Sequence, residues 1–172
     1  MATSPDNKNF LSPIGFQFSI QKLPNVNYFC TSASVPSITL GDLDYQTPFI
    51  NLPTPGDKLS FGQLIINFRI DEDMRNFREI YDWMLGIGVP DTFNQRHPRL
   101  RASMNSADPT VYSDASLLVL TNQYKPNVEV KFVDMYPVDL SSFEFNIEQN
   151  DIEYLTGSAT FAYRKYELTT VT

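Results

Sequence analysis

The sequence feature that most limits the fold of this chain is a period-two alternation of side chains over residues 59–70. If this segment is extended, one of its faces is apolar and consists of Leu64, Ile66, Phe68 and Ile70. The opposite face carries polar residues, namely Gln63, Asn67 and Arg69. Successive side chains of a β-strand point to opposite faces of a sheet, so this pattern predicts a strand with one buried and one exposed side.

Shorter patterns of the same kind predict further strands in both halves of the chain. In the first half, strands over 14–22 and 26–34 flank a turn at Pro24–Asn25 and form a hairpin. In the second half, the expected strands lie at 115–121, 127–136, 140–149 and 157–168. An aromatic share of 13% favours strands, because broad side chains pack well on a pleated surface.

One helix is expected directly after the strand at 59–70. Asp71 can cap its N-terminus, and Gly86 and Gly88 followed by Pro90 end it. Its apolar residues recur at helical spacing, at Met74, Phe77, Ile80, Tyr81 and Met84. The whole chain, residues 1–172, therefore reads as a single mainly β domain. We expect a β-sandwich or barrel of about six or seven strands with one packed α-helix.

Three segments lack a clear core pattern. Residues 1–12 read as a flexible N-terminal arm, while 36–58 and 89–114 read as long loops, the first with brief edge strands possible. Long loops in compact domains are often functional, so we expect the first of them to contact a neighbouring copy of the chain. The residues assigned to this contact are Pro48, Phe49, Pro53, Pro55, Asp57 and Lys58.

The charge balance argues against a protein that clamps nucleic acid. Thirteen Lys and Arg stand against 20 Asp and Glu, for a net charge of −7. Tight binding to nucleic acid neutralises phosphates with basic side chains, which this composition does not favour. The polar first ten residues predict no signal peptide, and the short apolar runs predict no membrane-spanning helix.

The residues that could support catalysis are few. His97 is the single histidine and Cys30 the single cysteine, which argues against a zinc site and against an intrachain disulfide. No glycine-rich phosphate-binding motif is present. The acidic pairs Asp71/Asp73 and Asp151/Glu153 lie at a helix start and a turn, where acidic residues are common. We therefore expect no enzyme, cofactor or metal. The basic cluster of Arg96, Arg99 and Arg101 is equally compatible with a solvated loop and with contact to an acidic partner surface.

The order of the motifs resembles the tail tube proteins of contractile-tailed bacteriophages, which share a fold with the haemolysin-coregulated tube protein of type VI secretion. The resemblance covers about four-fifths of the chain, and residues 89–114 fit it least. It follows G-F-Q-F-S-I (15–20), F-C-T-S-A-S-V-P (29–36), P-G-D-K-L-S-F-G-Q-L-I-I-N-F (55–68), D-E-D-M-R-N-F-R-E-I-Y-D-W-M (71–84), V-E-V-K-F-V-D-M-Y-P-V-D-L (128–140) and E-Q-N-D-I-E-Y-L-T-G-S-A-T-F-A-Y-R-K-Y-E (148–167).

This resemblance implies a structural virion protein that forms stacked hexameric rings, the inner tube through which DNA is ejected. The implied partners are further copies of the chain, the tail sheath protein, baseplate or hub proteins and the tape-measure protein. The resemblance also implies that DNA would pass through the lumen without specific binding and that assembly would take place in the host cytoplasm. Polar strand faces would line the lumen, through Gln63, Asn67, Glu144, Asn146 and Glu148.

Other functions stay open from sequence alone. A tube-initiating baseplate protein or a tube terminator of the same fold is the nearest alternative. A β-barrel that binds a small molecule belongs to a different class, and its expected monomeric state would distinguish it. A hydrolase with a dispersed site is the least favoured reading.

Overall fold

The computed structural model describes residues 9–88, 111–146 and 154–171, which form nine strands and two helices. This confirms the mainly β fold with a packed helix. The first half contains β1 (Phe16–Ile20), α1 (Pro24–Phe29), β2 (Cys30–Ala33), β3 (Ile38–Gln46), β4 (Asn51–Phe61), β5 (Leu64–Arg69) and α2 (Arg75–Ile87). The second half contains β6 (Ser113–Leu120), β7 (Pro126–Leu140), β8 (Thr156–Ala162) and β9 (Lys165–Thr170).

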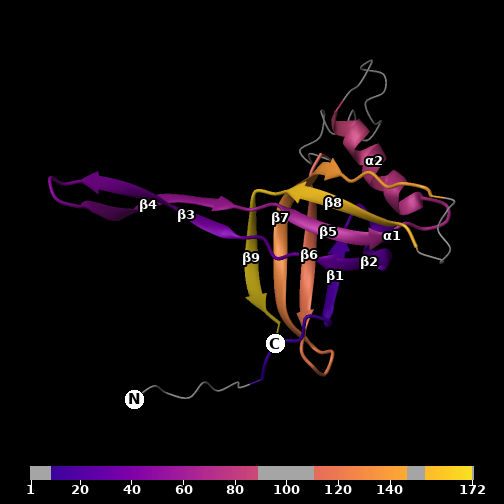
Figure 1. Ribbon diagram of the computed structural model, residues 1–172. Coiled ribbons are helices and arrows are strands. Elements are labelled where there is room, and N and C mark those ends of the chain that lie inside the picture. The colour runs from indigo at the N-terminus through magenta and orange to yellow at the C-terminus, as the bar shows by residue number, and fades with distance from the viewer. Residues whose placement is uncertain (1–8, 89–110, 147–153, 172) are drawn as a thin grey trace, which may run out of the picture.

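The body of the protein is a seven-stranded sheet that bends at its longest strand. Strands follow the order β1-β6-β7-β8-β5-β2, and β9 pairs with the first part of β7. Figure 1 shows β9, β7, β6 and β1 running nearly perpendicular to β8, β5 and β2. Since β7 pairs with β6 and β9 before the bend and with β8 after it, this one strand joins both parts.

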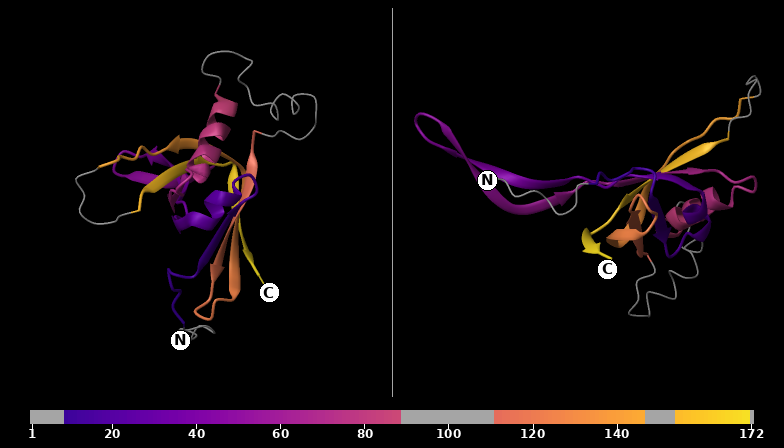
Figure 2. Two further views of the ribbon diagram at one scale, coloured as in Figure 1. Left: turned by 90° about the vertical axis from the view of Figure 1, so that its right-hand side faces the viewer. Right: turned by 90° about the horizontal axis from the view of Figure 1, so that it is seen from below.

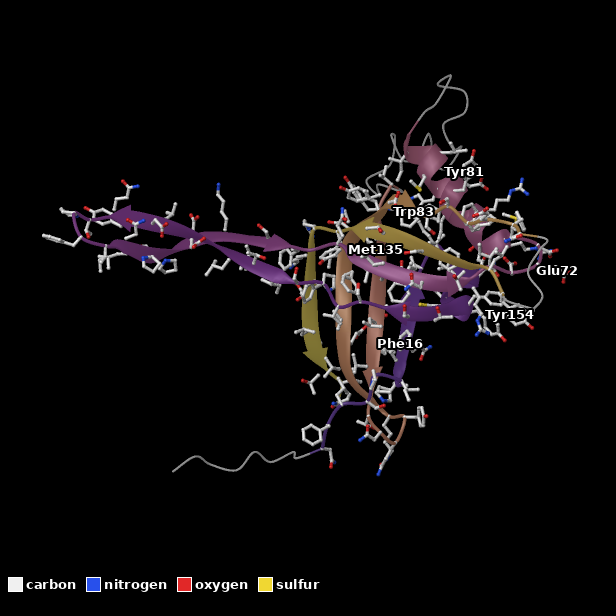
Figure 3. All side chains as sticks on the ribbon, in the orientation of Figure 1. Phe16, Glu72, Tyr81, Trp83, Met135 and Tyr154 are labelled. Carbon is white, nitrogen blue, oxygen red and sulfur yellow. The ribbon has the colours of Figure 1, made fainter. Side chains whose placement is uncertain are left out.

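The core lies inside this bend and combines aliphatic side chains with several aromatic rings. Phe68 from β5, Phe132 from β7 and Phe161 from β8 are fully buried. Helix α2 adds Trp83, whose ring lies 6.2 Å from that of Phe161. Figure 3 shows Trp83 at the contact between α2 and the sheet. The alternation seen at 64–69 is thus a strand with its apolar face in the core, as predicted.

The predicted hairpin over 14–34 is wrong. Pro24 to Phe29 form α1, and β1 and β2 pair with β6 and β5 instead of with each other. Proline suits the first turn of a helix, where its missing N–H leaves no hydrogen bond unmade. The Asn27 side chain then holds the turn, donating to the Ile20 carbonyl (3.0 Å) and accepting from the Ile20 N–H (2.7 Å).

The loop predicted at 36–58 is instead a hairpin of two long strands, β3 and β4. Its second strand takes in residues 59–61, so the strand predicted at 59–70 is divided at Gly62 and Gln63. Of the loop predicted at 89–114, residues 113 and 114 begin β6, and 89–110 lie outside the described residues. The same holds for residues 1–8 of the N-terminal arm.

The second half also differs from the predicted boundaries. The turn expected at Pro137–Asp139 is a bulge within the single strand β7, so residues 141–146 follow this strand without being part of another. The strand expected at 157–168 is divided into β8 and β9, which pair with different parts of the bent sheet. Proline is tolerated at such bulges because the ladder hydrogen bond is already missing there.

Helix α2 begins three residues later than predicted. Its N-cap is Met74, with a left-handed φ of 54°, while the Asp71 carboxylate accepts a hydrogen bond from the Asn76 N–H (3.2 Å). The buried face of the helix runs through Ile80 and Trp83, and Tyr81 is 49% exposed. The buried face of the helix therefore includes Trp83 and leaves out Tyr81, which the apolar spacing had placed on it.

Gly157 permits the close packing of β8 on β5. A Cβ built at this position would lie 2.9 Å from Cζ of the buried Phe68 ring. We therefore expect Gly157→Ala to lower the free energy of unfolding by about 1–3 kcal/mol, the usual cost of overpacking a core. Urea denaturation measures this loss, and an unchanged midpoint would show that the Phe68 ring can move aside.

Candidate assembly surfaces

The long hairpin, residues 38–61, extends away from the body, as Figure 1 and the right view of Figure 2 show. Nearly all of its residues are exposed, including large apolar ones. The exposed apolar side chains are Ile38, Leu40, Leu43, Tyr45, Phe49, Ile50, Leu52 and Leu59. A soluble protein rarely leaves so many together without a partner, which makes the hairpin a candidate interaction surface.

The distal half of the long hairpin has two chemically different faces. Tyr45 pairs with Leu52 and Leu43 with Thr54, so these residues share one largely apolar face. The opposite face pairs Asp42 with Pro55 and Asp44 with Pro53. The proline residues also remove backbone donors from this edge, which limits unspecific strand pairing. The hairpin is therefore apolar on one side and acidic on the other.

An aromatic cluster attaches the long hairpin to the body. Phe61, the last residue of β4, lies 5.6 Å from Tyr166 and 6.2 Å from Tyr163, measured between ring centroids. The Tyr166 hydroxyl donates to the Pro36 carbonyl (3.2 Å), just before β3 begins. Both strands are thus fixed at their base. The cluster raises the pKa of Tyr163 to about 12, chiefly through burial and secondarily through Tyr166.

Close backbone contact at Gly41 and Gly56 forms the bulge in the long hairpin. The pairing register shifts between Leu40 and Asp42, and a Cβ at Gly56 would lie 2.6 Å from the Gly41 carbonyl oxygen. Only glycine fits position 56 without moving the opposite strand. The bulge therefore separates a base that is attached to the body from a distal half that carries the two faces.

The six residues predicted to contact a neighbouring copy all lie exposed on the long hairpin. The contact itself stays a prediction. Sequence reasoning missed Leu43, Tyr45 and Leu52, which form the apolar face. The signal for the first two was present, since Asp42 and Asp44 alternate with Leu43 and Tyr45 at the period of a strand. The many prolines of the segment obscured it.

The structure does not bring the predicted lumen residues together on one strand. Asn67 lies on the exposed face of β5, where its amide donates to the Ser32 hydroxyl (2.8 Å). Gln63 is exposed between β4 and β5. Glu144 and Asn146 follow the end of β7 and are exposed, and Glu148 lies outside the described residues. The lumen assignment therefore stays a prediction.

The exposed face around Asn67 is rich in small polar groups. Register places Asn67 opposite Ser158, Ile65 opposite Thr160 and Arg69 opposite Thr156. Hydroxyl and amide groups thus outnumber charged ones on this part of β5 and β8. Such a surface is hydrated, and because it carries little net charge it neither attracts nor repels phosphate strongly.

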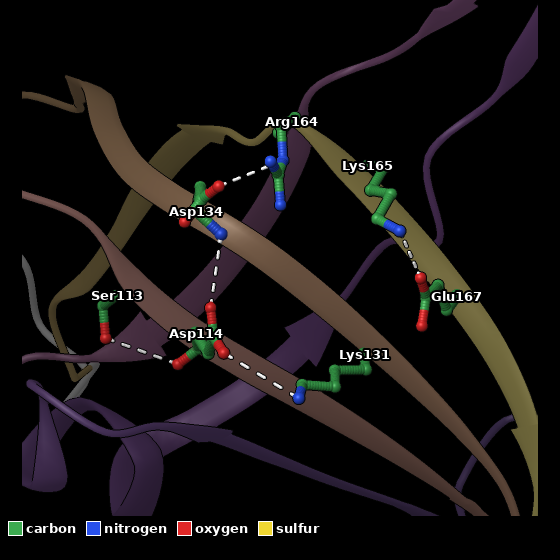
Figure 4. A network of polar contacts seen from close by, with 7 residues as sticks. All are labelled: Ser113, Asp114, Lys131, Asp134, Arg164, Lys165 and Glu167. Atoms are coloured by element: carbon green, nitrogen blue, oxygen red, sulfur yellow. Dashed lines mark hydrogen bonds and ion pairs between the residues drawn. The ribbon is translucent and has the colours of Figure 1, made fainter.

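A network of charged residues covers the outer side of the bend (Figure 4). Asp134, with a left-handed φ of 56°, marks the corner of β7 and pairs with Arg164 at 3.0 Å. Its N–H donates to the Asp114 carboxylate (3.3 Å), which also lies 3.9 Å from Lys131. On the neighbouring β9, a hydrogen bond from Lys165 lowers the pKa of Glu167. These exposed pairs contribute little stability and give a face with both charge signs.

The sheet leaves strand edges available for pairing. Within the described residues, β1, β2 and β9 each pair with a single strand of the body. An unpaired edge presents free N–H and C=O groups that another chain can use. Together with the long hairpin, these edges are the places at which a second copy could join the sheet.

The structure gives no support for catalysis by Cys30. This thiol lies at the start of β2, and its burial raises its pKa to about 11 despite a hydrogen bond to the Ser32 backbone. The described part of the chain holds no group of three or more His, Cys, Asp or Glu that could bind a metal ion. His97 and the cluster of Arg96, Arg99 and Arg101 lie outside the described residues. None of the described helices is long and apolar enough to cross a membrane.

The raised pKa gives a direct test with iodoacetamide. A shift from 9.0 to about 11 leaves about 100-fold less thiolate at pH 8, and the thiolate is the species that reacts. We expect Cys30 in the folded protein to be alkylated about that much more slowly than in urea, with the rate rising up to about pH 11. Equal rates in the folded and unfolded protein would contradict the raised pKa.

Similar folds are found in contractile injection machines. The chain matches a subunit in a structure of the anti-feeding prophage cap, described as the tube terminating cap, with a TM-score of 0.67 and 13% identity over 98% of this chain and 97% of that one. It also matches a subunit of the PVC sheath–tube complex of an extracellular contractile injection system, with a TM-score of 0.60 and 13% identity over 99% and 100%. At these identities, the likeness concerns the fold.

The chain thus has the fold of these cap and tube subunits. A family model described as phage tail tube protein matches residues 3–169. The chain therefore belongs to the phage tail tube protein family, as its sequence motifs suggested. It is also 25% identical over 141 residues to the tail tube terminator protein of Enterobacteria phage T4, which covers 80% of this chain and 74% of that protein. The family and these relatives are structural proteins and not enzymes.

Proposed function

We propose that this chain terminates the tail tube: six copies form a closed ring that sits on the end of the tube and stops its growth. This favours the terminator over the tube-body subunit that the sequence alone suggested first. The proposal depends most on the likeness to the tail tube terminator protein of phage T4, which extends over four-fifths of the chain. The tube terminating cap of the anti-feeding prophage, with a TM-score of 0.67, points the same way.

The geometry supports assembly of this kind. Strands β1, β2 and β9 leave edges open, and the long hairpin exposes apolar side chains that the body does not cover. Joining edges between copies around an axis removes them, as in a closed barrel. A hairpin on one side of each copy meets a different surface of the next copy, and such heterologous contacts close into rings when the rotation allows it.

The partners follow from this position in the tail. The ring would contact the last tube ring on one side, and the end of the sheath and the tape-measure protein lie nearby. DNA would pass through its opening on the way out of the virion. The hydroxyl and amide face around Asn67 suits this passage, and we assign it to the channel together with the predicted Gln63, Glu144, Asn146 and Glu148.

Electron microscopy of the purified chain tests the proposal. We expect separate rings in negative stain and no rods, because a terminator must not stack on itself. Added to growing tubes assembled from the tube-body subunit of the same phage, the rings should bind one end and stop elongation. Long hollow rods formed by the chain alone would instead establish a tube-body subunit.

If the chain is instead a β-barrel that binds a small molecule, a different result is expected. Such a protein would stay monomeric at every concentration and would bind an apolar ligand in a cavity of its body. A chain that never forms rings, with or without tube ends, would therefore end the terminator proposal in favour of this alternative.

A further inference from the structure

The body carries a hollow with a largely apolar lining. It has a volume of about 700 Å³ and lies where the N-terminal segment crosses the ends of β6, β7 and β9. Its apolar lining includes Phe10, Leu11, Val119, Val128, Val130 and Leu168. Leu168 remains 65% exposed and Phe10 91% exposed. A concave apolar surface of this size is suited to receive a partner's side chains.

The far end of the long hairpin presents two exposed apolar side chains that could insert into a partner surface. Phe49 is 95% exposed and Ile50 is 62% exposed, and they stand at the turn between β3 and β4. The turn is braced, since the Thr47 N–H donates to the Ile50 carbonyl (3.2 Å) and the Ile50 N–H donates to the Thr47 hydroxyl (3.2 Å). A turn fixed before binding loses little conformational freedom when it inserts.

The hairpin end and the hollow of one copy are far apart. Figures 1 and 2 show the long hairpin directed away from the body, while the ends of β6 and β7 that line the hollow lie at the other side of the bend. The aromatic cluster at Phe61 fixes this direction. The hairpin end therefore cannot fill the hollow of its own chain. The hairpin end of another copy can fill it.

The charges of the two surfaces are complementary. Among the described residues that line the hollow, Lys125 is the only charged one. The distal half of the long hairpin carries Asp42 and Asp44 on its acidic face and no basic residue between them and the turn. Opposite charges at the rim of an apolar contact favour one orientation and speed association. The same complementarity favours a second copy over an apolar small molecule.

We propose that the turn of the long hairpin, with Phe49 and Ile50, inserts into the apolar hollow of the next copy, its Asp42 and Asp44 side facing Lys125. The contact is heterologous, since each copy gives its hairpin to one neighbour and its hollow to the other. This inference rests on the proposed ring and names the receiving surface within it.

Two single variants test the contact by complementation. Phe49→Asp destroys the hairpin end and leaves the hollow intact, whereas Leu168→Lys does the reverse. Both residues are largely exposed, so neither change should unfold the body. Each variant alone should need about 100-fold more protein than the wild type to form rings, as expected for loss of an aromatic anchor. An equimolar mixture should form a heterodimer of one copy of each and no ring.

Matched controls place the effect on these surfaces. Tyr81→Lys adds the same charge at an exposed apolar residue of α2, and Tyr28→Asp removes another highly exposed aromatic ring away from the hairpin and the hollow. Both should form rings like the wild type. Mass photometry separates monomers, heterodimers and rings. Rings formed by either test variant at the concentration that suffices for the wild type, or a mixture that stays monomeric, would overturn the insertion while leaving the ring proposal intact. A wild-type chain that never forms rings would overturn both.

Discussion

A chain with a shortened long hairpin is expected to fold normally and to lose ring formation completely. Leu40 and Leu59 are paired in register, so an Asn-Gly turn in place of residues 41–58 would close a short hairpin at that pair. The base, with Ile38 paired to Phe61 and the aromatic cluster, is retained. Electron microscopy and mass photometry measure the loss of rings.

Folding should be nearly unaffected because β3 and β4 pack mainly on each other. The removed residues are almost all exposed, so the free energy of unfolding in urea should change by less than about 1 kcal/mol. A matched control keeps the full hairpin and changes its charges with Asp42→Asn and Asp44→Asn. This variant should still form rings at moderately higher concentration, since exposed charges act mostly on association rate. Rings formed by the shortened chain would show that the sheet edges alone suffice.

The core strands could be predicted from sequence because their two faces differ in chemistry. Leu64, Ile66 and Phe68 are fully buried, and their neighbours on the strand are exposed. Burial of an apolar face is the main source of folding free energy, and it leaves a direct period-two record in the sequence. The prediction of a mainly β protein of the tail tube type followed from this record and from the order of the motifs.

Features set by single local contacts could not be predicted in this way. Part of the segment at 24–29 was predicted to be a strand. The hydrogen bonds of the Asn27 side chain to the Ile20 backbone stabilise the helix α1 instead. The corner of β7 depends on Asp134 in a left-handed conformation, which a sequence pattern does not specify. Pro137 looked like a turn and is a bulge within the pairing of β7 with β8, which continues on both sides of it.

The candidate surfaces were harder to predict than the core for a physical reason. The hollow is formed by Phe10, Val119 and Leu168, which come from three distant parts of the chain. No local pattern joins them, and each alone reads as an ordinary apolar residue. The segment of the long hairpin was predicted to contact another copy, but its acidic and apolar faces became visible only once the pairing register of β3 and β4 was known.

Trp83→Ala is expected to have the largest effect on stability of any substitution in α2. The indole is 9% exposed, and its ring packs on Phe161. Its N–H donates to the Val111 carbonyl (3.0 Å), just before β6 begins. Truncation leaves a cavity and an unpaired carbonyl, and such changes cost about 3–5 kcal/mol. Much of the stability of a domain, about 5–15 kcal/mol, would be lost.

Tyr81→Ala is the matched control, because this aromatic residue lies on the same helix but outside its buried face. It is 49% exposed, so the free energy of unfolding should fall by less than about 1 kcal/mol. Urea denaturation of both variants, followed by circular dichroism, gives the comparison. Equal losses would mean that the helix presents the face predicted from its apolar spacing, with Tyr81 inward. If the indole holds α2 against β8 and the segment before β6, only Trp83→Ala should lower the free energy of unfolding strongly.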